Sequence, residues 1–335
     1  MVSERTCHIK TIFWLKESNT LESVLLYSGI EASDSFAISF VIPTFKRTKL
    51  LVSAIDSILN QRNLERTTFE IIVVNNNPSD NMKELIEKYR GEKISFYKNI
   101  KNYGQVGNIN RGIELSRGKY VSFLHDDDLL LENYLDVIFP YISCEKHFDC
   151  LVPSQYSVLK NYKFDFKHVL INIALFPRFF YRGHQKNINH KDCLFSFRDV
   201  YNPPTCGVIF SKESLDGFGY FKECNGAAWD FYNFREYNKK YKVVLLHKKL
   251  GARRIYTGMS NKKEVFDDFL EDEKWIVRHN KNNSFIKKYG EAMIQRKGLK
   301  YIAGKILSSL YFYLHNLDGI SIAPKRIYHI ITKGD

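Results

Sequence analysis

Lys119-Tyr-Val-Ser-Phe-Leu-His-Asp-Asp-Asp128 is the stretch of sequence that predicts the fold of this chain most directly. Its apolar part has the length and composition of a buried strand. Three carboxylates follow at once, and α/β folds bind ligands where such strands end. Asp126, Asp127 and Asp128 would repel one another unless a cation or hydrogen-bond donors compensate. Mg²⁺ and Mn²⁺ use such oxygen ligands and share them with phosphate groups. The alternative is an acidic loop in which Asp128 caps a helix that begins at Leu129.

The chain before this stretch alternates between apolar runs and amphipathic patterns. Runs rich in β-branched and aromatic residues predict strands, and apolar residues at helical spacing predict helices. The predicted strands are 37–42, which Pro43 ends, 69–74, 94–97 and 120–124, and the predicted helices are 50–59, 80–89, with Asp80 as its N-cap, and 105–117. Because strands alternating with helices form βαβ units, residues 37–130 predict an α/β domain of the nucleotide-binding type with a mostly parallel sheet.

The flanking parts are less regular. Residues 1–36 show no clear period and are expected to form an N-terminal appendage. Residues 131–260 are expected to complete the same domain, and residues 261–335 to form a helical, basic C-terminal region. The middle part contains predicted strands at 207–210 and 243–246, a predicted helix at 229–240, and an apolar run at 169–181 that Pro177 interrupts.

The composition indicates a globular protein with anionic partners. The 335 residues are 44% hydrophobic and 15% aromatic, which suffices for a sizeable core in one large domain or two smaller ones. The net charge of +13 and pI of about 9.2 favour nucleic acid, anionic lipid or phosphate-bearing substrates. Six cysteines without a CxxC pair favour free thiols in a reducing cytoplasm. No secretory signal and no apolar stretch of about 20 residues is found, so a soluble or peripheral protein is expected.

Two polar loops follow the first two predicted strands. Pro43-Thr-Phe-Lys-Arg47 precedes a predicted helix, and a helix N-terminus with adjacent cations suits phosphate. Taken alone, this loop is better explained as a strand that ends at proline, followed by two solvated cations. Asn75-Asn-Asn77 offers donors and acceptors that could read a base edge, although asparagine is also an ordinary turn residue.

Four segments, in matching order and spacing, resemble family-2 glycosyltransferases of the GT-A fold. They are residues 39–47, 69–75, 102–112 and 118–128. The resemblance covers residues 37–130 and then weakens, although 219–223 and 229–230 resemble the family's G-x-F-x-E … E-D segment. It implies an α/β/α domain of the GT-A type that uses a UDP-sugar or another nucleotide-sugar donor.

The resemblance also implies roles for individual residues. The implied contacts to the nucleotide sugar are Pro43, Thr44, Phe45, Arg47, Asn76, Asn102, Gly104, Asn108, Asp126, Asp127 and Arg254. Asn76 would touch the uracil, and Asp127 would be the direct ligand of Mg²⁺ or Mn²⁺. Arg254, with Arg253, would close over the diphosphate, unless both belong to a solvated basic loop after the strand at 243–246.

Three positions depart from the family pattern. Asn75 and Asn76 stand where the family often has aspartate, which leaves the identity of the base open. His125 replaces the first aspartate of the usual Asp-x-Asp, which weakens a metal site built from two carboxylates. Trp229 replaces a glutamate and suggests an aromatic wall against the acceptor sugar.

The expected chemistry is displacement at the anomeric carbon with inversion. A divalent ion and Lys or Arg would stabilise the leaving diphosphate, while a carboxylate takes the proton of the acceptor hydroxyl. Asp230 is the implied general base, with Glu223 as the substitute. The alternative for Asp230 is the N-cap of a helix that begins at Phe231.

The C-terminal region suggests contact with a membrane surface. Leu299, Ile302, Ile306, Leu310 and Tyr313 share one helical face, which lysines flank. Such a helix can lie on an anionic leaflet, or it can pack against the catalytic domain. The apolar run at 169–181 could help to approach a lipid-linked acceptor.

The sequence therefore predicts an inverting, metal-dependent glycosyltransferase that extends a bacterial cell-surface glycan on a saccharide or lipid-linked acceptor. It is expected in the cytoplasm or on the inner face of the cell membrane. A sugar-phosphate nucleotidyltransferase is disfavoured because residues 43–47 contain no glycine for a phosphate loop. A nucleic-acid-binding protein is disfavoured because no RNA-binding motif accompanies the basic charge. A non-catalytic relative of the transferases is the remaining alternative.

Overall fold

The computed structural model describes residues 21–143, 148–158, 186–187, 206–219, 221 and 229–254. Its strands are β1 (Ser23–Ser28), β2 (Ile38–Thr44), β3 (Phe69–Asn75), β4 (Ile94–Asn99), β5 (Tyr120–Phe123), β6 (Asp128–Leu130), β7 (Cys150–Val158), β8 (Lys186–Asn187), β9 (Val208–Ser211) and β10 (Val243–Arg254). Its helices are α1 (Thr48–Leu59), α2 (Lys83–Lys88), α3 (Gly104–Leu115), α4 (Tyr134–Ser143), α7 (Lys212–Phe218) and α8 (Trp229–Tyr237), with a short 3₁₀ helix η1 (Leu64–Arg66).

Within the described residues, ten strands form one sheet. The strand order is β1-β4-β3-β2-β5-β9-β7-β10-β6, and β8 pairs with β10. Strands β4, β3, β2 and β5 are parallel neighbours, which confirms the predicted parallel sheet. Because β3 and β4 lie on one side of β2 and β5 lies on the other, the order of the strands reverses between β2 and β5. Open α/β sheets bind ligands at such a switch point.

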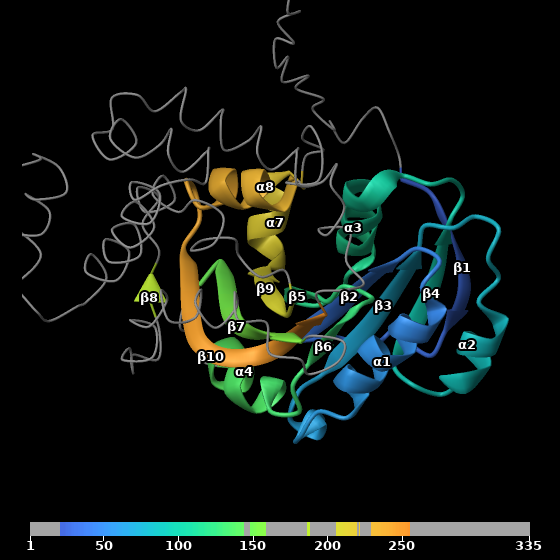
Figure 1. Ribbon diagram of the computed structural model, residues 1–335, viewed down its shortest axis with the longest axis horizontal. Coiled ribbons are helices and arrows are strands. Elements are labelled where there is room, and N and C mark those ends of the chain that lie inside the picture. The colour runs from blue at the N-terminus through green and yellow to red at the C-terminus, as the bar shows by residue number, and fades with distance from the viewer. Residues whose placement is uncertain are drawn as a thin grey trace, which may run out of the picture.

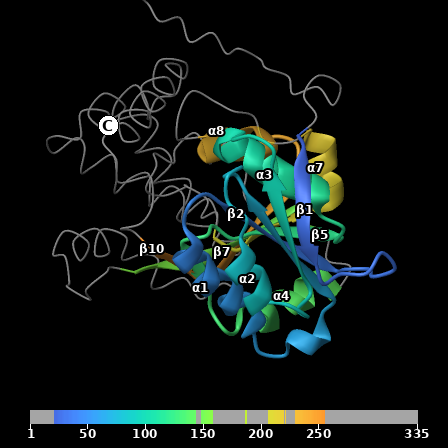
Figure 2. The ribbon, with the colours of Figure 1, turned by 90° about the vertical axis from the view of Figure 1, so that its right-hand side faces the viewer.

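Helices cover both faces of the sheet. Figures 1 and 2 show α1, α2 and α4 on one side and α3, α7 and α8 on the other. The side chains of β2 alternate between these faces: Ile38, Phe40 and Ile42 belong to the core under α1, and Val41 belongs to the core under α3. A strand buried on both faces needs apolar residues at nearly every position, which explains the apolar run, interrupted only by Ser39, that predicted it.

Two local predictions are wrong, and two of the alternatives are excluded. Strand β2 continues through Pro43 to Thr44 and does not end at the proline. Asp80 is not the N-cap of α2: the cap is Met82, whose N–H donates to Asp80 Oδ1 at 3.0 Å. Asp128 begins a strand and caps no helix, because β6 pairs with β10. The same strand, β10, extends to Arg254, so the basic pair at its end is not in a loop.

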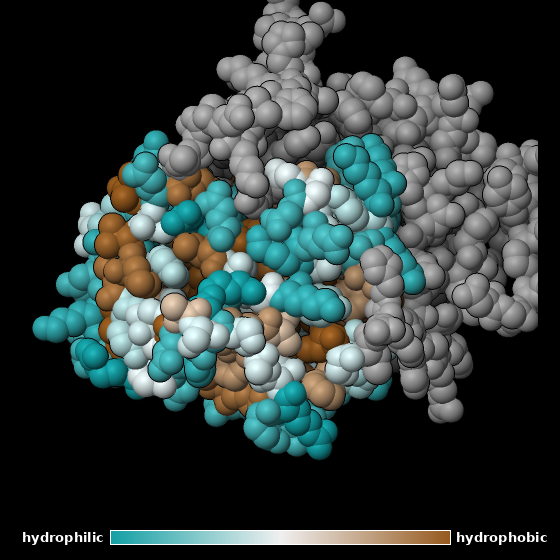
Figure 3. Space-filling model, turned by 180° about the vertical axis from the view of Figure 1, so that it is seen from behind, coloured by the Kyte–Doolittle hydropathy of each residue, from teal (hydrophilic) through white to brown (hydrophobic). Residues whose placement is uncertain are grey.

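Strand β1 is an element that the sequence did not predict within residues 1–36. It pairs antiparallel with β4 and adds an edge to the parallel part of the sheet. Val24 and Leu25 on this strand, and Ile100 just after β4, are about half exposed. Figure 3 shows hydrophobic surface on the left of that view, the side on which β1 lies.

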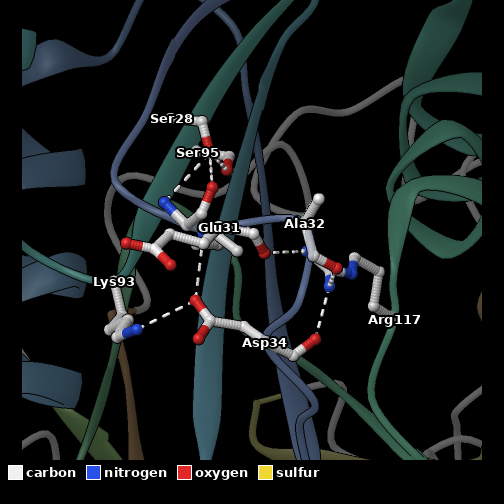
Figure 4. A network of polar contacts seen from close by, with 8 residues as sticks. Ser28, Glu31, Ala32, Asp34, Lys93, Ser95 and Arg117 are labelled. Atoms are coloured by element: carbon white, nitrogen blue, oxygen red, sulfur yellow. Dashed lines mark hydrogen bonds and ion pairs between the residues drawn. The ribbon is translucent and has the colours of Figure 1, made fainter.

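A polar network fastens the loop after β1 to the amino ends of the parallel strands (Figure 4). The Arg117 guanidinium donates to the backbone carbonyls of Glu31, Ala32 and Asp34. The Asp34 carboxylate accepts from the N–H of Glu31 at 3.0 Å and from Lys93 Nζ at 2.9 Å. Lys93 directly precedes β4, and Arg117 lies three residues before the start of β5. This network therefore lies at the end of the sheet opposite the switch point.

Several predicted features lie outside the described residues. They are the apolar run at 169–181, Glu223 and the helical region from 261 onward. In the described part of the chain, no helix is both long and apolar enough to cross a bilayer. Cys150 and Cys206 are buried free thiols.

Candidate functional site

Polar side chains from β2, α1 and the loop after β5 meet at the switch point. Thr44 ends β2, and its Oγ1 donates to Oδ2 of Asp126 at 2.8 Å. Arg47 is the N-cap residue of α1, but its side chain makes no cap hydrogen bond. Its Nη1 lies instead 3.3 Å from Oδ1 of Asp126 and 2.8 Å from Oδ2 of Asp127. The fold thus joins four residues that were predicted to contact the donor.

The two carboxylates of this group are almost withdrawn from water. The side chain of Asp126 is 7% exposed and that of Asp127 is 10% exposed. Burial raises the pKa of Asp126, while the Thr44 hydrogen bond and the charge of Arg47 act in the opposite direction. Burial likewise raises the pKa of Asp128 to about 6. Positive charge beside Asp126 and Asp128 opposes this effect and favours the ionised form of both carboxylates.

Strand β10 brings a second arginine to the acidic loop, by which we mean residues 126–128 after β5. The N–H of Arg254 donates to Oδ1 of Asp128 at 3.3 Å, and its Nη1 donates to the backbone carbonyl of Asp127 at 3.4 Å. In the strand register, Arg253 is the partner of Asp128. Both arginines are therefore held by strand pairing, which rules out the alternative of a solvated loop, although contact with a diphosphate stays a prediction.

A network of asparagine amides lies at the neighbouring strand ends. Asn76 Nδ2 donates to Asn102 Oδ1 at 2.7 Å and to the carbonyl of Gly104 at 2.9 Å. Its Oδ1 accepts from Asn99 Nδ2 at 3.0 Å and from the N–H of Tyr103 at 2.9 Å. Both amide hydrogens and both lone pairs of Asn76 are then occupied. In this arrangement the side-chain amide of Asn76 positions the start of α3 and has no donor or acceptor left over for uracil. The contact between Asn76 and the base stays a prediction.

Asn108 ties α3 to the same strand ends. Its Nδ2 donates to the carbonyl of Val74 at 3.0 Å and to that of Thr44 at 3.4 Å, and its Oδ1 accepts from Asn99 Nδ2 at 2.9 Å. Asn99, which links both asparagines, was missed because the strand was predicted to end at residue 97. The sequence did contain a signal for Asn99: it is a polar residue two positions after the predicted strand 94–97, just as Asn75 and Asn76 follow the predicted strand 69–74.

The remaining predicted donor contacts differ in exposure. Phe45 is 41% exposed directly after β2, and the Nζ of Lys46 lies 5.2 Å from the centroid of its ring. Asn102 is also exposed, whereas Pro43 is buried inside β2. Phe45 and Asn102 are therefore accessible at this end of the sheet, whereas Pro43 is part of the strand that Phe45 follows. Their contact with a donor stays a prediction.

Asp230 lies in the first turn of α8. It is the second residue of this helix, so the structure does not place it at the N-cap position. Trp229 and Phe234 of the same helix pack into the core under α3. The fold therefore holds Asp230 on a helix that packs against the core, and its role as a base stays a prediction.

The acidic loop fits a divalent ion on one condition. No group of three or more His, Cys, Asp or Glu side chains is arranged to hold a metal among the residues that the structure describes. Oxygens of Asp126 and Asp127 nevertheless converge on one cationic atom, Nη1 of Arg47. Mg²⁺ is commonly held by one or two carboxylates together with phosphate oxygens and water. The residues present suit Mg²⁺ or Mn²⁺ when a bound diphosphate completes the ligand set.

Comparison with known proteins identifies the domain type. Residues 39–202 match the family model described as glycosyl transferase family 2. Over 105 residues the chain is 38% identical to the GalNAc(5)-diNAcBac-PP-undecaprenol beta-1,3-glucosyltransferase of Campylobacter jejuni, which covers 30% of this chain and 33% of that protein. Over 107 residues it is 36% identical to the poly(ribitol-phosphate) beta-N-acetylglucosaminyltransferase TarP of Staphylococcus aureus, which covers 31% of this chain and 32% of that protein. The chain thus spans about a third of the length of each relative.

The fold is similar to that of a solved structure with a nucleotide sugar. The crystal structure of S. aureus TarS 1-349 in complex with UDP-GlcNAc aligns with a TM-score of 0.56 at 17% identity, covering 88% of this chain and 83% of that chain. At this identity the likeness concerns the fold, and it agrees with the mixed α/β architecture described above.

Proposed function

Since residues 39–202 of this chain belong to glycosyl transferase family 2, we propose that the protein transfers a sugar from a nucleotide-sugar donor, with a UDP-sugar as the expected form. The observation that carries the proposal is the meeting of Thr44, Arg47, Asp126 and Asp127 at the switch point of the sheet. The TarS structures with UDP-GlcNAc and UDP support the class of donor.

The donor would lie across the carboxyl ends of β2 and β5. Phe45, which is exposed, offers an apolar face to the nucleoside, and Asn102 offers an exposed amide. Arg47 and Arg254 would neutralise the negative charge that grows on the diphosphate as it leaves. When bound, Mg²⁺ or Mn²⁺ would add positive charge at the same place, and Asp127 with Asp126 would hold it.

The acceptor hydroxyl must lose a proton as its oxygen attacks the anomeric carbon. We propose Asp230 as the group that accepts this proton while the oxygen attacks on the side opposite the leaving diphosphate, a single displacement that inverts the anomeric carbon. Its place in the first turn of α8 fixes the backbone of the residue on a packed helix. Such fixation suits a base that must meet the acceptor in one geometry.

The proposed acceptor is a saccharide or a lipid-linked saccharide of a bacterial surface glycan. The names of the C. jejuni and S. aureus relatives, which act on an undecaprenol-linked glycan and on poly(ribitol-phosphate), support this class. The net charge of +13 suits an anionic membrane surface, so we place the protein in the cytoplasm or on the inner face of the membrane.

Replacement of Asp127 by asparagine tests this function. The variant keeps the size of the side chain but removes one charge from the proposed metal site. We expect Mn²⁺-dependent release of UDP from a UDP-sugar to fall by about a hundredfold or more, in the range of lost electrostatic catalysis. The measurement is UDP release with a panel of UDP-sugars, with and without Mn²⁺.

Asp216→Asn is the matched control. Asp216 pairs with Lys212 on α7 and its side chain is 54% exposed, so the same change of charge is made away from the switch point. This variant should retain wild-type UDP release. Full activity of Asp127→Asn would contradict the site assignment, and release of UDP by neither the wild type nor Asp216→Asn would contradict the function.

A further inference from the structure

We propose that, in the absence of the nucleotide-sugar donor, the Arg47 side chain occupies the cation position between Asp126 and Asp127, here called the acidic pair. A divalent ion must then displace Arg47 in order to bind there. On displacement, the Arg47 guanidinium pairs with the diphosphate of the donor. This inference rests on the proposed function, because it names the step that couples metal binding to donor binding at the same site.

The geometry places one guanidinium atom where an ion would bind. Nη1 of Arg47 contacts Oδ1 of Asp126 and Oδ2 of Asp127 at 3.3 Å and 2.8 Å. Two adjacent carboxylates therefore direct one oxygen each to a single positive atom. A divalent ion that uses the same two oxygens cannot share the place with Nη1, since two cations in contact repel each other.

Charge balance explains why a cation stays there at all times. The carboxylates of Asp126 and Asp127 are nearly buried, and a buried charge without a partner is strongly unfavourable. Arg47 supplies one positive charge against two negative ones. A divalent ion would neutralise the pair fully and would release Arg47 for another anion.

The position of Arg47 allows such a change of partner. Arg47 directly precedes α1, at the end of the sheet where the parallel strands have their carboxyl ends. Its side chain is 28% exposed, whereas both aspartates are nearly buried. Among the described residues, the hydrogen bonds of its guanidinium go to these two carboxylates. The exposed end of a long side chain can turn to a diphosphate without movement of the helix that follows it.

The proposal predicts opposite effects of one substitution. Removal of the Arg47 charge should strengthen binding of Mn²⁺ alone, because nothing then competes for the acidic pair. The same change should weaken binding of UDP at saturating Mn²⁺, because the diphosphate loses a partner. A residue that only binds the nucleotide-sugar donor would change the affinity for UDP and leave the affinity for Mn²⁺ alone unaltered.

The test uses Arg47→Gln in the full chain. Free Mn²⁺, counted by electron paramagnetic resonance without nucleotide, should show a Kd about tenfold lower than that of the wild type, as expected when one charge-assisted pair no longer competes. UDP titrated calorimetrically at saturating Mn²⁺ should bind about tenfold more weakly. Circular dichroism confirms that the variant is folded.

Two further variants complete the design. Arg62→Gln is the matched control, because Arg62 pairs with a single exposed carboxylate, that of Glu132, and both affinities should stay at the wild-type values. Arg47→Lys should bind Mn²⁺ about threefold more tightly than the wild type, because a lysine point charge matches two carboxylates less well than a guanidinium. This second variant carries the test if Arg47→Gln does not fold.

The outcomes separate this inference from the function. An unchanged or weaker affinity for Mn²⁺ in the Arg47 variants overturns the inference, even where the wild type turns over a UDP-sugar. Tighter Mn²⁺ binding in these variants supports it, even where no nucleotide sugar is turned over and the proposed function has failed.

Discussion

Asn76 shows how the surroundings of one residue alter the role that its position suggests. The family resemblance implied contact with the base, but the four hydrogen bonds of its amide are directed to Asn102, Gly104, Asn99 and Tyr103. The residue is also buried. Asn76 therefore shapes the turn into α3, and the exposed Asn102 is the amide nearest to solvent in this network.

These surroundings are unfavourable for aspartate at position 76, although the family that the sequence resembles often has aspartate there. In Asn76→Asp, a carboxylate oxygen would face Asn102 Oδ1 and the carbonyl of Gly104, which are both acceptors. We expect a loss of about 1–3 kcal/mol in the free energy of unfolding, the usual cost of unsatisfied buried groups. Urea denaturation followed by circular dichroism measures it. Stability equal to that of the wild type would show that the amide network can be rearranged at little cost.

At the scale of elements, α3 lies unusually close to β2. A Cβ built on Gly112 would lie 2.2 Å from Cγ1 of Val41, which is closer than two carbon atoms can approach. The absence of a side chain at Gly112 thus lets α3 rest on the strand. That contact holds Asn108 near the carboxyl ends of β2 and β3.

Gly112→Ala should therefore destabilise the fold although alanine favours helices. The gain in helix propensity is about 1 kcal/mol, and overpacking of a core costs about 1–3 kcal/mol. We expect a net loss in the free energy of unfolding, measured by urea denaturation. Gly217→Ala is the control: its Cβ would meet the hydroxyl end of Tyr241, which can move aside. A loss of equal size in both variants would contradict the role given to the α3–β2 contact.

The elements that the sequence predicted well are those buried on both faces. Strands β2 and β3 have consecutive apolar residues because helices cover them on either side, and this pattern is local. Strand β6 could not be predicted, because three residues from Asp128 become a strand only by pairing with Gly251–Arg253. Strand β1 was missed for the same reason: it is a half-exposed edge whose partner is β4.

The candidate site, like the strands, could be predicted only in part from the sequence. Thr44, Arg47, Asp126 and Asp127 follow recognisable strands, so their meeting at one edge could be anticipated from the order of the elements. The ion pairs between Arg47 and both aspartates could not, because they depend on the direction of side chains. The sequence also could not show that every hydrogen-bonding group of the Asn76 side chain is occupied, because its partners come from β4 and the start of α3.

At the scale of the whole molecule, the excess of basic residues bears on the proposed contact with a membrane surface. The net charge is +13. Attraction to an anionic leaflet amounts to about 1 kcal/mol for each basic residue close to the surface, and it decays within a Debye length. Several basic residues acting together would supply enough attraction for the proposed binding to an anionic membrane surface.

This charge predicts salt-dependent binding to vesicles. The full chain should sediment with vesicles that contain phosphatidylglycerol at low salt, and remain in solution with pure phosphatidylcholine. Binding should be largely lost at about 0.5 M NaCl, where the screening length is only a few ångströms. Equal sedimentation with both vesicle types, unaffected by salt, would instead indicate apolar insertion.

The pairing of β6 with β10 also determines when the site can form. The N–H of Arg254 reaches Oδ1 of Asp128 across 126 residues of chain. Closing a loop of that length is slow, since its entropy must be lost before the contact stabilises anything. During synthesis, the acidic loop therefore leaves the ribosome long before its partner strand exists. A nascent chain that ends before β10 would carry the parallel sheet, but its three aspartates would still be without the arginines of that strand.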